Sequence, residues 1–388
     1  MTTRCPGCFQ HLPEDGYLWI CRSGRCPTQP DDVAGRYAGK SVENGPLIYR
    51  VRPANAGKNW VPEVPTGCPD CKQAAVQEAC VRCHHGLLPG WRDGHATCVA
   101  MNGSRATGKS LYIAVLVKQL DQLMAKLSTT VQFADARTRE NYTEIYEKPL
   151  YESRGLMPPT PSAITDSSYQ REPLIFSLGI INGVRRFLVI RDVAGEDMER
   201  PPADIAPLNF LANADAVFFM FDPMAVPEIR AKLQDLVPTQ SQLGGDPHAV
   251  LDNLMNIIGG ATPRLAVILS KFDAMQELRK VEDIDWQSIM SNSGAAFLRD
   301  PSLDSAQYQE DDGELLHEEV RSLLHKLNAG RLVRSLENPH SGKPIPYRFF
   351  AVSALGEAPR GESVHPRGIA PFRSLDPAKW VLSLTGAI

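Results

Sequence analysis

The sequence has no long apolar run, no large excess of either charge, and only one cysteine after residue 83. Because a helix needs about 20 apolar residues to span a bilayer, no segment is expected to cross a membrane. Residues 1–6 also lack the apolar core of a signal peptide. The net charge of −4 gives no general reason to expect a nucleic-acid partner. We therefore expect a cytoplasmic protein without a membrane partner.

The composition is that of a globular protein. Hydrophobic residues make up 43% of the 388 positions and charged residues 22%. No low-complexity run interrupts the chain. A chain of this length suits one large domain together with a smaller one.

Eight of the nine cysteines precede residue 84, which in a cytoplasmic chain favours metal binding over disulfides. They form two sets of closely spaced pairs: Cys5, Cys8, Cys21 and Cys26, followed by Cys68, Cys71, Cys80 and Cys83. Four thiolates make a closed tetrahedral zinc site, so we predict one structural Zn²⁺ per set, about two in all. His84 and His85 could replace a ligand, but solvated loop histidines are the favoured interpretation. The ninth cysteine, Cys98, lies in an apolar strand and is predicted to be a buried, unreactive thiol.

Residues 31–66, between the two cysteine sets, are rich in Gly, Pro and Asn, and a strand pair is predicted at Leu47–Val51. Because this region holds too few apolar side chains for a core, zinc is expected to decide whether it folds. We predict a zinc-binding module over residues 1–90, a main domain over 95–357 and a C-terminal extension over 358–388.

The main domain begins with a phosphate-binding motif. A short apolar strand, Thr97–Met101, precedes the spacing G-x-x-x-x-G-K-S over Gly103–Ser110, and an apolar helical pattern follows from Leu111. The glycines let backbone N–H groups surround a phosphate, and Lys109 reaches its outer oxygens. Ser110 offers a hydroxyl to Mg²⁺, and the start of the helix adds a positive dipole end.

A second motif follows a predicted hairpin, whose turn is Asn182-Gly183. The strand after this turn ends in Asp192, and Gly195 stands three residues later. An aspartate at the end of a buried strand can hold the water shell of Mg²⁺, and the glycine lets a backbone N–H approach a terminal phosphate.

Alternating strand and helix patterns predict a mostly parallel sheet. The predicted strands are Thr97–Met101, Thr130–Ala134, Leu174–Ile180, Arg186–Asp192, Ala216–Asp222, Leu265–Ser270 and Tyr347–Ser353. The predicted helices run from Leu111, over Arg137–Tyr151, over Val250–Ile258 and over Leu315–Leu336.

Two strands end in residues suited to a guanine base. Asp273, in Ser270-Lys271-Phe272-Asp273, can accept hydrogen bonds from both donors on one guanine edge, and the Lys271 stem can lie across the base. The other strand leads into Ser353-Ala354-Leu355, whose backbone N–H groups can reach the guanine carbonyl. Open α/β sheets bind ligands at these carboxyl ends.

These four motifs, in this order, resemble the translation-factor and Ras-like class of P-loop GTPases over residues 95–357. The zinc-binding front end also makes the chain similar to the bacterial double-GTPase group linked to conflict and defence gene clusters. The resemblance implies an α/β fold with a mostly parallel sheet flanked by helices and preceded by a small zinc-ribbon module. It also implies a Mg²⁺-dependent switch that binds GTP and GDP.

The resemblance assigns roles to individual residues. Those that bind the nucleotide are Gly103, Ser104, Arg105, Ala106, Thr107, Gly108, Lys109, Ser110, Leu111, Gly195, Ser270, Lys271, Asp273, Ser353, Ala354 and Leu355. Ser110, Asp192 and a switch threonine would hold Mg²⁺; Thr160, in a proline-stiffened loop, is the first choice and Thr165 the second. Lys109, Glu196 and Thr160 are the expected catalytic residues.

Three positions depart from the family pattern. Ser270 replaces the usual Asn of the base motif, and Arg105 stands where Ras-like proteins carry Gly. Glu196 occupies the place of the Gln that orients the attacking water in many relatives. Arg105 could crowd an arginine finger from a partner, lie near the phosphates itself, or simply face solvent.

The sequence therefore predicts a GTPase that is slow without help and whose zinc module docks a protein partner, in a bacterial defence or signalling system. The alternative is a guanine-nucleotide-binding scaffold whose zinc ribbons bind nucleic acid. An ATPase is disfavoured by Asp273.

Overall fold

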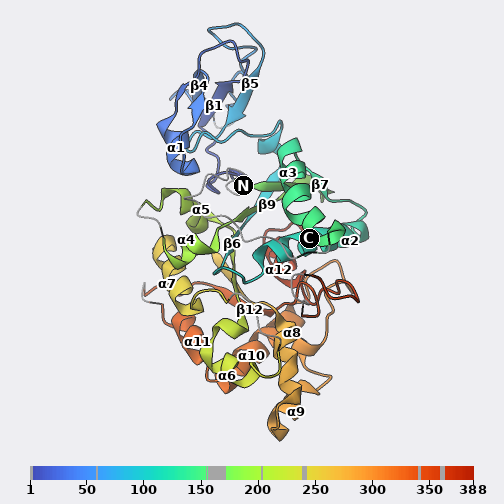
Figure 1. Ribbon diagram of the computed structural model, residues 1–388. Coiled ribbons are helices and arrows are strands. Elements are labelled where there is room, and N and C mark those ends of the chain that lie inside the picture. Colours follow the sequence, from blue (N-terminus) through green and yellow to red (C-terminus); the bar gives the residue numbers. More distant parts are fainter. Residues whose placement is uncertain are drawn as a thin grey trace.

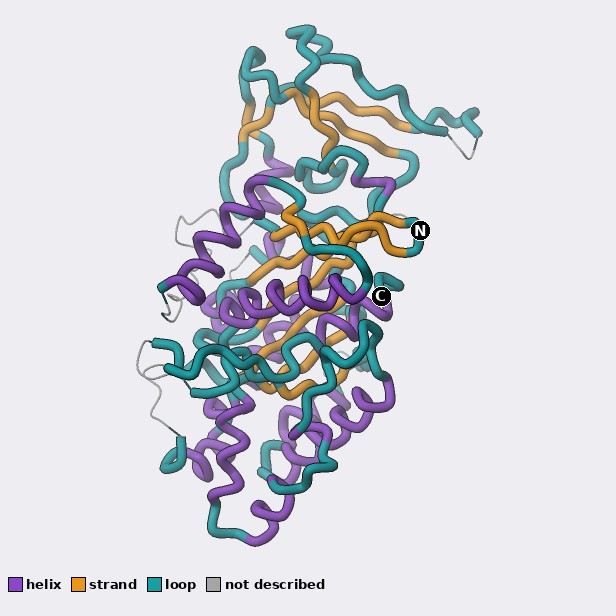
Figure 2. Tube along the Cα trace, turned by 90° about the vertical axis from the view of Figure 1, so that its right-hand side faces the viewer, coloured by secondary structure: helices purple, strands orange, loops and turns teal. Residues whose placement is uncertain are grey.

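The computed structural model describes residues 3–57, 60–153, 155, 172–201, 204–237, 243–339, 342–358 and 363–388. A seven-stranded sheet forms the centre of the larger domain, and a three-stranded sheet with one short helix lies beyond its end (Figure 1). Figure 2 shows the central sheet crossing the middle of the molecule with helices on both sides. No helix in these ranges is long and apolar enough to cross a membrane.

The central sheet has the strand order β12-β11-β10-β6-β9-β8-β7. Its strands are β6 (His95–Asn102), β7 (Gln132–Phe133), β8 (Leu174–Ile181), β9 (Val184–Asp192), β10 (Ala216–Phe221), β11 (Arg264–Leu269) and β12 (Tyr347–Ala351). The five strands from β12 to β9 pair in parallel, whereas β8 and β7 pair antiparallel. The predicted mostly parallel sheet is thus confirmed.

Sequence explains these strands directly. β10 and β11 are nearly continuous apolar runs, as expected of strands covered on both faces. The β8–β9 hairpin turns at Asn182 and Gly183, which adopt φ angles of 53° and 77°. Asn-Gly suits this two-residue turn because both residues tolerate left-handed backbone.

Helices cover both sides of the sheet. They are α2 (Lys109–Lys126), α3 (Ala136–Asn141), α4 (Gly195–Glu199), α5 (Phe210–Asn213), α6 (Pro227–Leu233), α7 (Pro247–Ile258), α8 (Phe272–Gln276), α9 (Ile284–Met290), α10 (Glu310–Lys326), α11 (Gly330–Glu337) and α12 (Asp376–Leu384). Figure 1 shows α4, α5 and α7 on one side of the sheet and α2, α3 and α12 on the other.

Two predicted helices differ from the observed ones. The segment Leu315–Leu336 is two helices, α10 and α11, because Asn328 between them takes a left-handed φ of 60°. The segment Arg137–Tyr151 is α3 followed by a π-helix, Tyr142–Glu152, that contains Pro149. Proline lacks a backbone N–H, so regular α-helical bonding cannot continue through that position.

The C-terminal residues belong to the core of the larger domain. Ala378, Val381 and Leu382 of α12 lie with Leu116 of α2 against apolar side chains of β6, β9 and β10. Thr385, just after α12, bonds Thr97 of β6 through their hydroxyls at 2.8 Å. The predicted boundary at residue 357 therefore does not separate this helix from the sheet.

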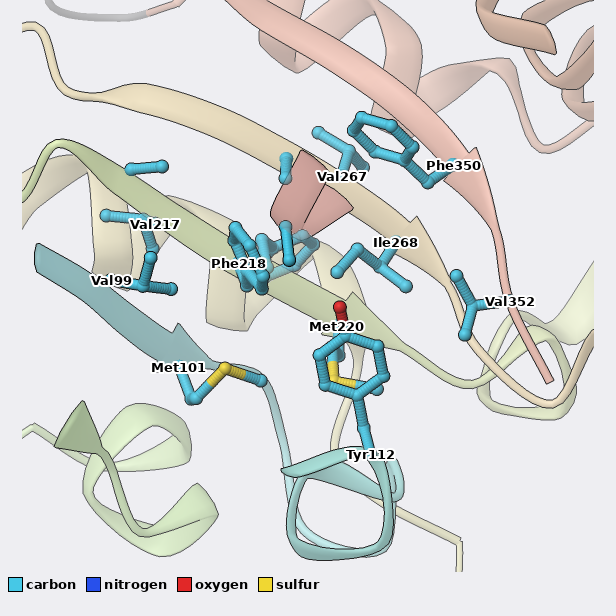
Figure 3. Packing of buried hydrophobic residues seen from close by; sticks show 14 of the residues in the cluster. Val99, Met101, Tyr112, Val217, Phe218, Met220, Val267, Ile268, Phe350 and Val352 are labelled. Carbon is cyan, nitrogen blue, oxygen red and sulfur yellow. The ribbon is translucent and has the colours of Figure 1, made fainter. Parts of the chain in front are cut away.

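Side chains from neighbouring strands fill the space between the sheet and α2. Figure 3 shows Val99, Phe218 and Ile268, from three adjacent strands, with Tyr112 of α2 beside them. The rings of Tyr112 and Phe218 meet edge to face at 6.2 Å. This packing fixes the start of α2, and with it the end of the phosphate loop, against the sheet.

The N-terminal module is built on a sheet of order β4-β1-β5, comprising Leu47–Val51, Gly16–Cys21 and Val76–Ala79. The remaining elements are α1 (Asp32–Ala38) and a two-stranded pair, β2 (Gln29–Pro30) and β3 (Glu43–Asn44). The predicted strand at Leu47–Val51 is thus confirmed as β4. In the three-stranded sheet of this module, β1 pairs antiparallel with both β4 and β5. This pairing determines which cysteines at the strand ends lie close together.

Candidate functional site

The loop Gly103–Gly108 joins the end of β6 to the start of α2. Gly103 has a φ of 141°, and a Cβ placed on it would lie 2.2 Å from the carbonyl oxygen of Met220. Only glycine fits there, because L side chains rarely adopt this backbone and this one would meet backbone. Thr107 closes the loop by donating its hydroxyl to the Ser104 carbonyl at 3.0 Å. The predicted phosphate loop is therefore held in one compact shape, with Ser110 and Leu111 in the first turn of α2.

Lys109 lies inside this loop. Its ammonium group donates to the carbonyl oxygens of Gly103 at 2.8 Å and Ser104 at 2.9 Å, and the residue is only 5% exposed. Burial lowers the pKa of Lys109, while the charges of Asp192 and Glu199 act in the opposite direction. A positive charge is thus fixed where the loop can receive an anion.

Asp192 lies at the end of β9, opposite Met101 of β6 in the parallel register. Both of its carboxylate oxygens are buried, and neither has a hydrogen-bond partner among the described residues. Burial raises the pKa of Asp192 to about 6, although nearby Lys109 lowers it. A buried carboxylate normally has partners, so this orphaned pair of oxygens fits a site for a hydrated divalent cation.

The D-x-x-G segment packs directly on the phosphate loop. A Cβ on Gly195 would lie 2.3 Å from the backbone nitrogen of Arg105, so no larger residue fits between the two backbones. Gly244, from the segment before α7, lies against the same loop from a different part of the chain. Sequence reasoning singled out Gly195 but missed Gly244, since no local motif marks it.

A second residue that sequence reasoning missed is Glu199. One of its carboxylate oxygens accepts the backbone N–H groups of Arg105 at 2.9 Å and Gly245 at 3.0 Å. The other lies 3.3 Å from the Arg105 guanidinium, whose second arm lies 3.3 Å from Glu196. Arg105 is about half exposed and is held on the surface of the loop by two carboxylates of α4.

The predicted base-recognition residues meet at the carboxyl ends of β11 and β12. Ser353 donates its hydroxyl to the Asp273 carboxylate at 2.6 Å and accepts the Gly356 N–H at 2.9 Å. Burial raises the pKa of Asp273, and the Ser353 bond opposes that shift. Ser353 thus holds one oxygen of Asp273 in a defined orientation.

Lys271 and Ser270 connect the carboxyl end of β11 to the end of β10. Lys271 takes a left-handed φ of 49°, and its ammonium group lies 2.6 Å from the buried carboxylate of Asp222, a residue not singled out from sequence. Ser270 donates to the Phe221 carbonyl at 2.8 Å. The serine that replaces the usual asparagine therefore bonds the neighbouring strand.

Residues C-terminal to the loop Ser353–Leu355 hold this loop in place through backbone hydrogen bonds. Ser353 and Phe372 exchange backbone hydrogen bonds of 3.1 and 2.8 Å, and Ala370 donates to the Leu355 carbonyl at 3.0 Å. The next residue, Arg373, is 1% exposed and bonds Asp312 and Asp376. The positions of Ser353, Ala354 and Leu355 thus depend on the C-terminal segment.

The eight N-terminal cysteines form two groups with tetrahedral-site spacing. In the inner zinc site, Cys5 lies 3.6 Å from Cys83 and Cys8 lies 3.9 Å from Cys80, sulfur to sulfur. In the outer zinc site, Cys21 lies 3.8 Å from Cys71 and Cys26 lies 3.7 Å from Cys68. A tetrahedron with Zn–S bonds of about 2.3 Å places its sulfurs about 3.8 Å apart, so both groups fit zinc.

The predicted pairing of these cysteines was wrong, although their number and the count of two sites agree with the structure. β1 runs antiparallel to β5, with Leu18 opposite Ala79 and Cys21 opposite Val76. Cys80 and Cys83, which follow β5, therefore meet the two cysteines that precede β1. The two cysteines that precede β5 meet Cys21 at the end of β1 and Cys26 beyond it. Each site combines the two cysteine sets instead of using one.

His84 is not a solvated loop residue, contrary to the favoured interpretation. It is 5% exposed, and its ring bonds Asp31 at 2.7 Å and Tyr49 at 3.1 Å. Cys98 is fully buried, as predicted. Thr160 and Thr165, the predicted switch threonines, lie outside the described residues.

Comparison with known proteins places these features in context. The sequence model of the family described as Double-GTPase 2 matches residues 97–328. A protein of Mycolicibacterium smegmatis described as the putative ESX-1 scaffolding and assembly protein SaeC is 50% identical over 387 residues, which cover all of both chains.

Two of the similar solved structures are a bacterial selenocysteine-specific elongation factor and the GTP-bound GTPase-like domain of S. cerevisiae Ski7. They are 14% and 9% identical to this chain, with TM-scores of 0.28 and 0.32, over 75% and 76% of its length. The chain spans 29% and 50% of their own lengths.

The nested cysteine pairing can be tested by pulse alkylation. Cys68→Ser should release one of about two zinc ions and make Cys21, Cys26 and Cys71 reactive, because these share the outer site. Cys80 and Cys83 should stay protected at the inner site. Elemental analysis and peptide mapping give both results. Reactive Cys80 and Cys83 with protected Cys21 and Cys26 would instead support one zinc per cysteine set.

The orphaned carboxylate predicts an unusual stability effect. Because the folded-state pKa of Asp192 is raised from 3.8 to about 6, its ionised form destabilises the ligand-free protein as the pH rises through this window. Asp192→Asn should therefore stabilise the ligand-free larger domain at pH 8 by about 1–3 kcal/mol. Chemical unfolding at pH 8 and pH 5 measures this, and the gain should shrink at the lower pH. A variant less stable at pH 8 would contradict the assignment.

Proposed function

The chain belongs to the Double-GTPase 2 family, and we propose that it is a GTP-binding switch that hydrolyses GTP slowly on its own. Family membership confirms the resemblance drawn from the ordered motifs and supports GTP binding. The observation that carries the proposal furthest is the half-buried Asp273 carboxylate, oriented by Ser353 at the carboxyl ends of two parallel strands. A carboxylate there matches the two adjacent donors of guanine.

The phosphate end of the site supports the same proposal. Asp192 and Ser110 would hold Mg²⁺, which would screen the phosphate charge when bound. Lys109 supplies a fixed positive charge, and the positive dipole end at the start of α2 would favour an anion bound beside the loop. Thr160 is proposed as the further Mg²⁺ ligand of the switch loop.

Slow hydrolysis follows from the residues beside the phosphate loop. Glu196 stands in place of a water-orienting Gln and would add negative charge near the terminal phosphate. Its carboxylate also lies 3.3 Å from the Arg105 guanidinium, so each group partly offsets the charge that the other could offer to a phosphate. A partner that changes this pairing would accelerate the reaction.

The N-terminal module is proposed to dock a protein partner in the cytoplasm. Val51, Val61 and Val64 are each more than 60% exposed on and after β4. Residues 1–95 carry 11 Lys and Arg against 9 Asp and Glu, which is too balanced for a typical nucleic-acid surface. Since the Mycolicibacterium relative is described as a scaffolding and assembly protein, we propose that the switch controls assembly of a protein complex.

The base specificity tests the proposed function directly. GTP and GDP should bind tightly, and ATP should compete roughly a thousandfold less well, because adenine lacks both donors and would withdraw two hydrogen bonds from Asp273. Asp273→Asn should weaken guanine binding and improve tolerance of xanthosine nucleotides, whose 2-position carbonyl can accept from the amide. Competition titrations with labelled GTP measure both. Equal displacement by ATP would refute the GTPase assignment.

The turnover rate is a separate prediction. Purified protein with Mg²⁺ should hydrolyse GTP at about 10⁻³ s⁻¹, as unassisted small GTPases do. Single-turnover phosphate release measures the rate without interference from GDP dissociation. Many turnovers per second without a partner would show that Glu196 and Arg105 are already catalytically competent.

A further inference from the structure

The two zinc sites have different surroundings. At the inner site, Cys5, Cys8, Cys80 and Cys83 belong to the same buried cluster as the central sheet, together with Phe9 and Trp91. The outer-site cysteines do not belong to that cluster, and Cys21 follows Ile20 of a separate small cluster formed by Leu18, Ile20 and Ala79. Among the described residues, the inner-site cysteines are thus the ones that share a buried cluster with the domain that holds the phosphate loop.

The turn between Cys5 and Cys8 contacts β9 through one arginine. The Arg191 guanidinium donates to the carbonyl oxygen of Gly7, within this turn, and lies 3.8 Å above the Phe210 ring. Phe9, the residue after the turn, meets the same ring edge to face at 5.3 Å. The head of Arg191 is therefore enclosed by the cysteine turn and α5, and Arg191 is 9% exposed.

Arg191 immediately precedes Asp192, the proposed Mg²⁺ residue. Side chains alternate along a strand, so Arg191 faces the cysteine turn while Asp192 faces the phosphate loop. Because the Asp192 oxygens have no hydrogen-bond partner among the described residues, side-chain bonds do not fix this carboxylate. Its position depends on the backbone of β9, which Arg191 anchors next to it.

A second connection runs from the same turn to β6. Arg4, next to Cys5, pairs with Asp215 at 2.9 Å and donates to the Asn213 carbonyl at 2.8 Å. The other oxygen of Asp215 accepts the backbone N–H of Cys98 at 2.8 Å. The inner site thus contacts both strands that lead into the nucleotide-binding motifs.

We propose that the inner zinc site, acting through Arg191 as a positioning residue, sets the Asp192 carboxylate for Mg²⁺ and so links zinc occupancy to nucleotide binding. The inference rests on the proposed function. The outer zinc site, for which the described residues show no such contacts, stabilises its own module without this linkage. Linkage is reciprocal, so Mg²⁺ and GTP must in turn retain zinc at the inner site.

Reciprocity gives a test on the intact protein with an internal control. Zinc-loaded protein in Mg²⁺ is alkylated in pulses with and without a non-hydrolysable GTP analogue, and the cysteines are resolved by peptide mapping. The analogue should slow modification at Cys5, Cys8, Cys80 and Cys83 roughly fivefold or more, within the usual range of coupling. Modification of the four outer-site cysteines should not change. Equal slowing of both groups, or no slowing, would overturn the proposal.

Variants of Arg191 separate positioning from simple stability. Arg191→Met removes the bond to Gly7 and should raise the Mg²⁺ concentration needed for half-maximal tightening of GTP binding about fivefold or more. Arg191→Lys can still donate to Gly7 and should recover part of the loss. Arg185→Met, on an exposed position of the same strand, is the matched control and should leave the Mg²⁺ dependence unchanged.

The outcomes distinguish this inference from the proposed function. If the analogue does not bind in a parallel titration, the switch assignment and the coupling fail together. If it binds but Arg191→Met matches the Arg185→Met control in Mg²⁺ dependence, the coupling alone is wrong. Equal loss in Arg191→Lys and Arg191→Met would also contradict the role of the Gly7 bond.

Discussion

The site is arranged around the buried carboxylate of Asp192, which has no hydrogen-bond partner among the described residues. Ionising it without a hydrogen bond destabilises the ligand-free fold, as its raised pKa indicates. Lys109, at the start of α2, lowers the pKa of Asp192 but does not return it to the usual value of an aspartate. The fold tolerates the group because parallel pairing of β6 and β9 fixes it opposite Met101, beside the phosphate loop. Such local instability is typical of a position that a ligand completes.

Segments outside the motifs hold both ends of the site in place. At the phosphate end, the backbone of Gly195 and Gly244 packs closely against the phosphate loop. Glu199 accepts hydrogen bonds both from this loop and from the segment before α7. At the base end, Phe372 and Arg373 secure the loop that carries Ser353. The C-terminal segment therefore packs as part of the larger domain. These contacts explain how short motifs far apart in sequence form one rigid site.

The phosphate loop and most strands of the central sheet could be predicted because local sequence chemistry specifies them. The glycines and lysine of Gly103–Ser110 are needed for any backbone loop that surrounds a phosphate, and the apolar strands carry their own pattern. The cysteine pairing could not be predicted, since it depends on the antiparallel register of β1 and β5. Glu199 and Gly244 were missed because their contacts with the loop are long-range. The break between α10 and α11 at Asn328 was missed because the apolar periodicity alone predicted one continuous helix.

Hydrogen exchange across residues 191–199 tests the central claim most directly, since this segment joins Asp192 to Gly195 and Glu199. The account predicts that a GTP analogue with Mg²⁺ slows exchange in this segment well beyond the effect of GDP with Mg²⁺, because only the triphosphate carries the terminal phosphate that Gly195 is proposed to approach. Protection in the core of β10 should be the same in both states. Equal protection of residues 191–199 by the two nucleotides would contradict a switch and leave only a nucleotide-binding scaffold.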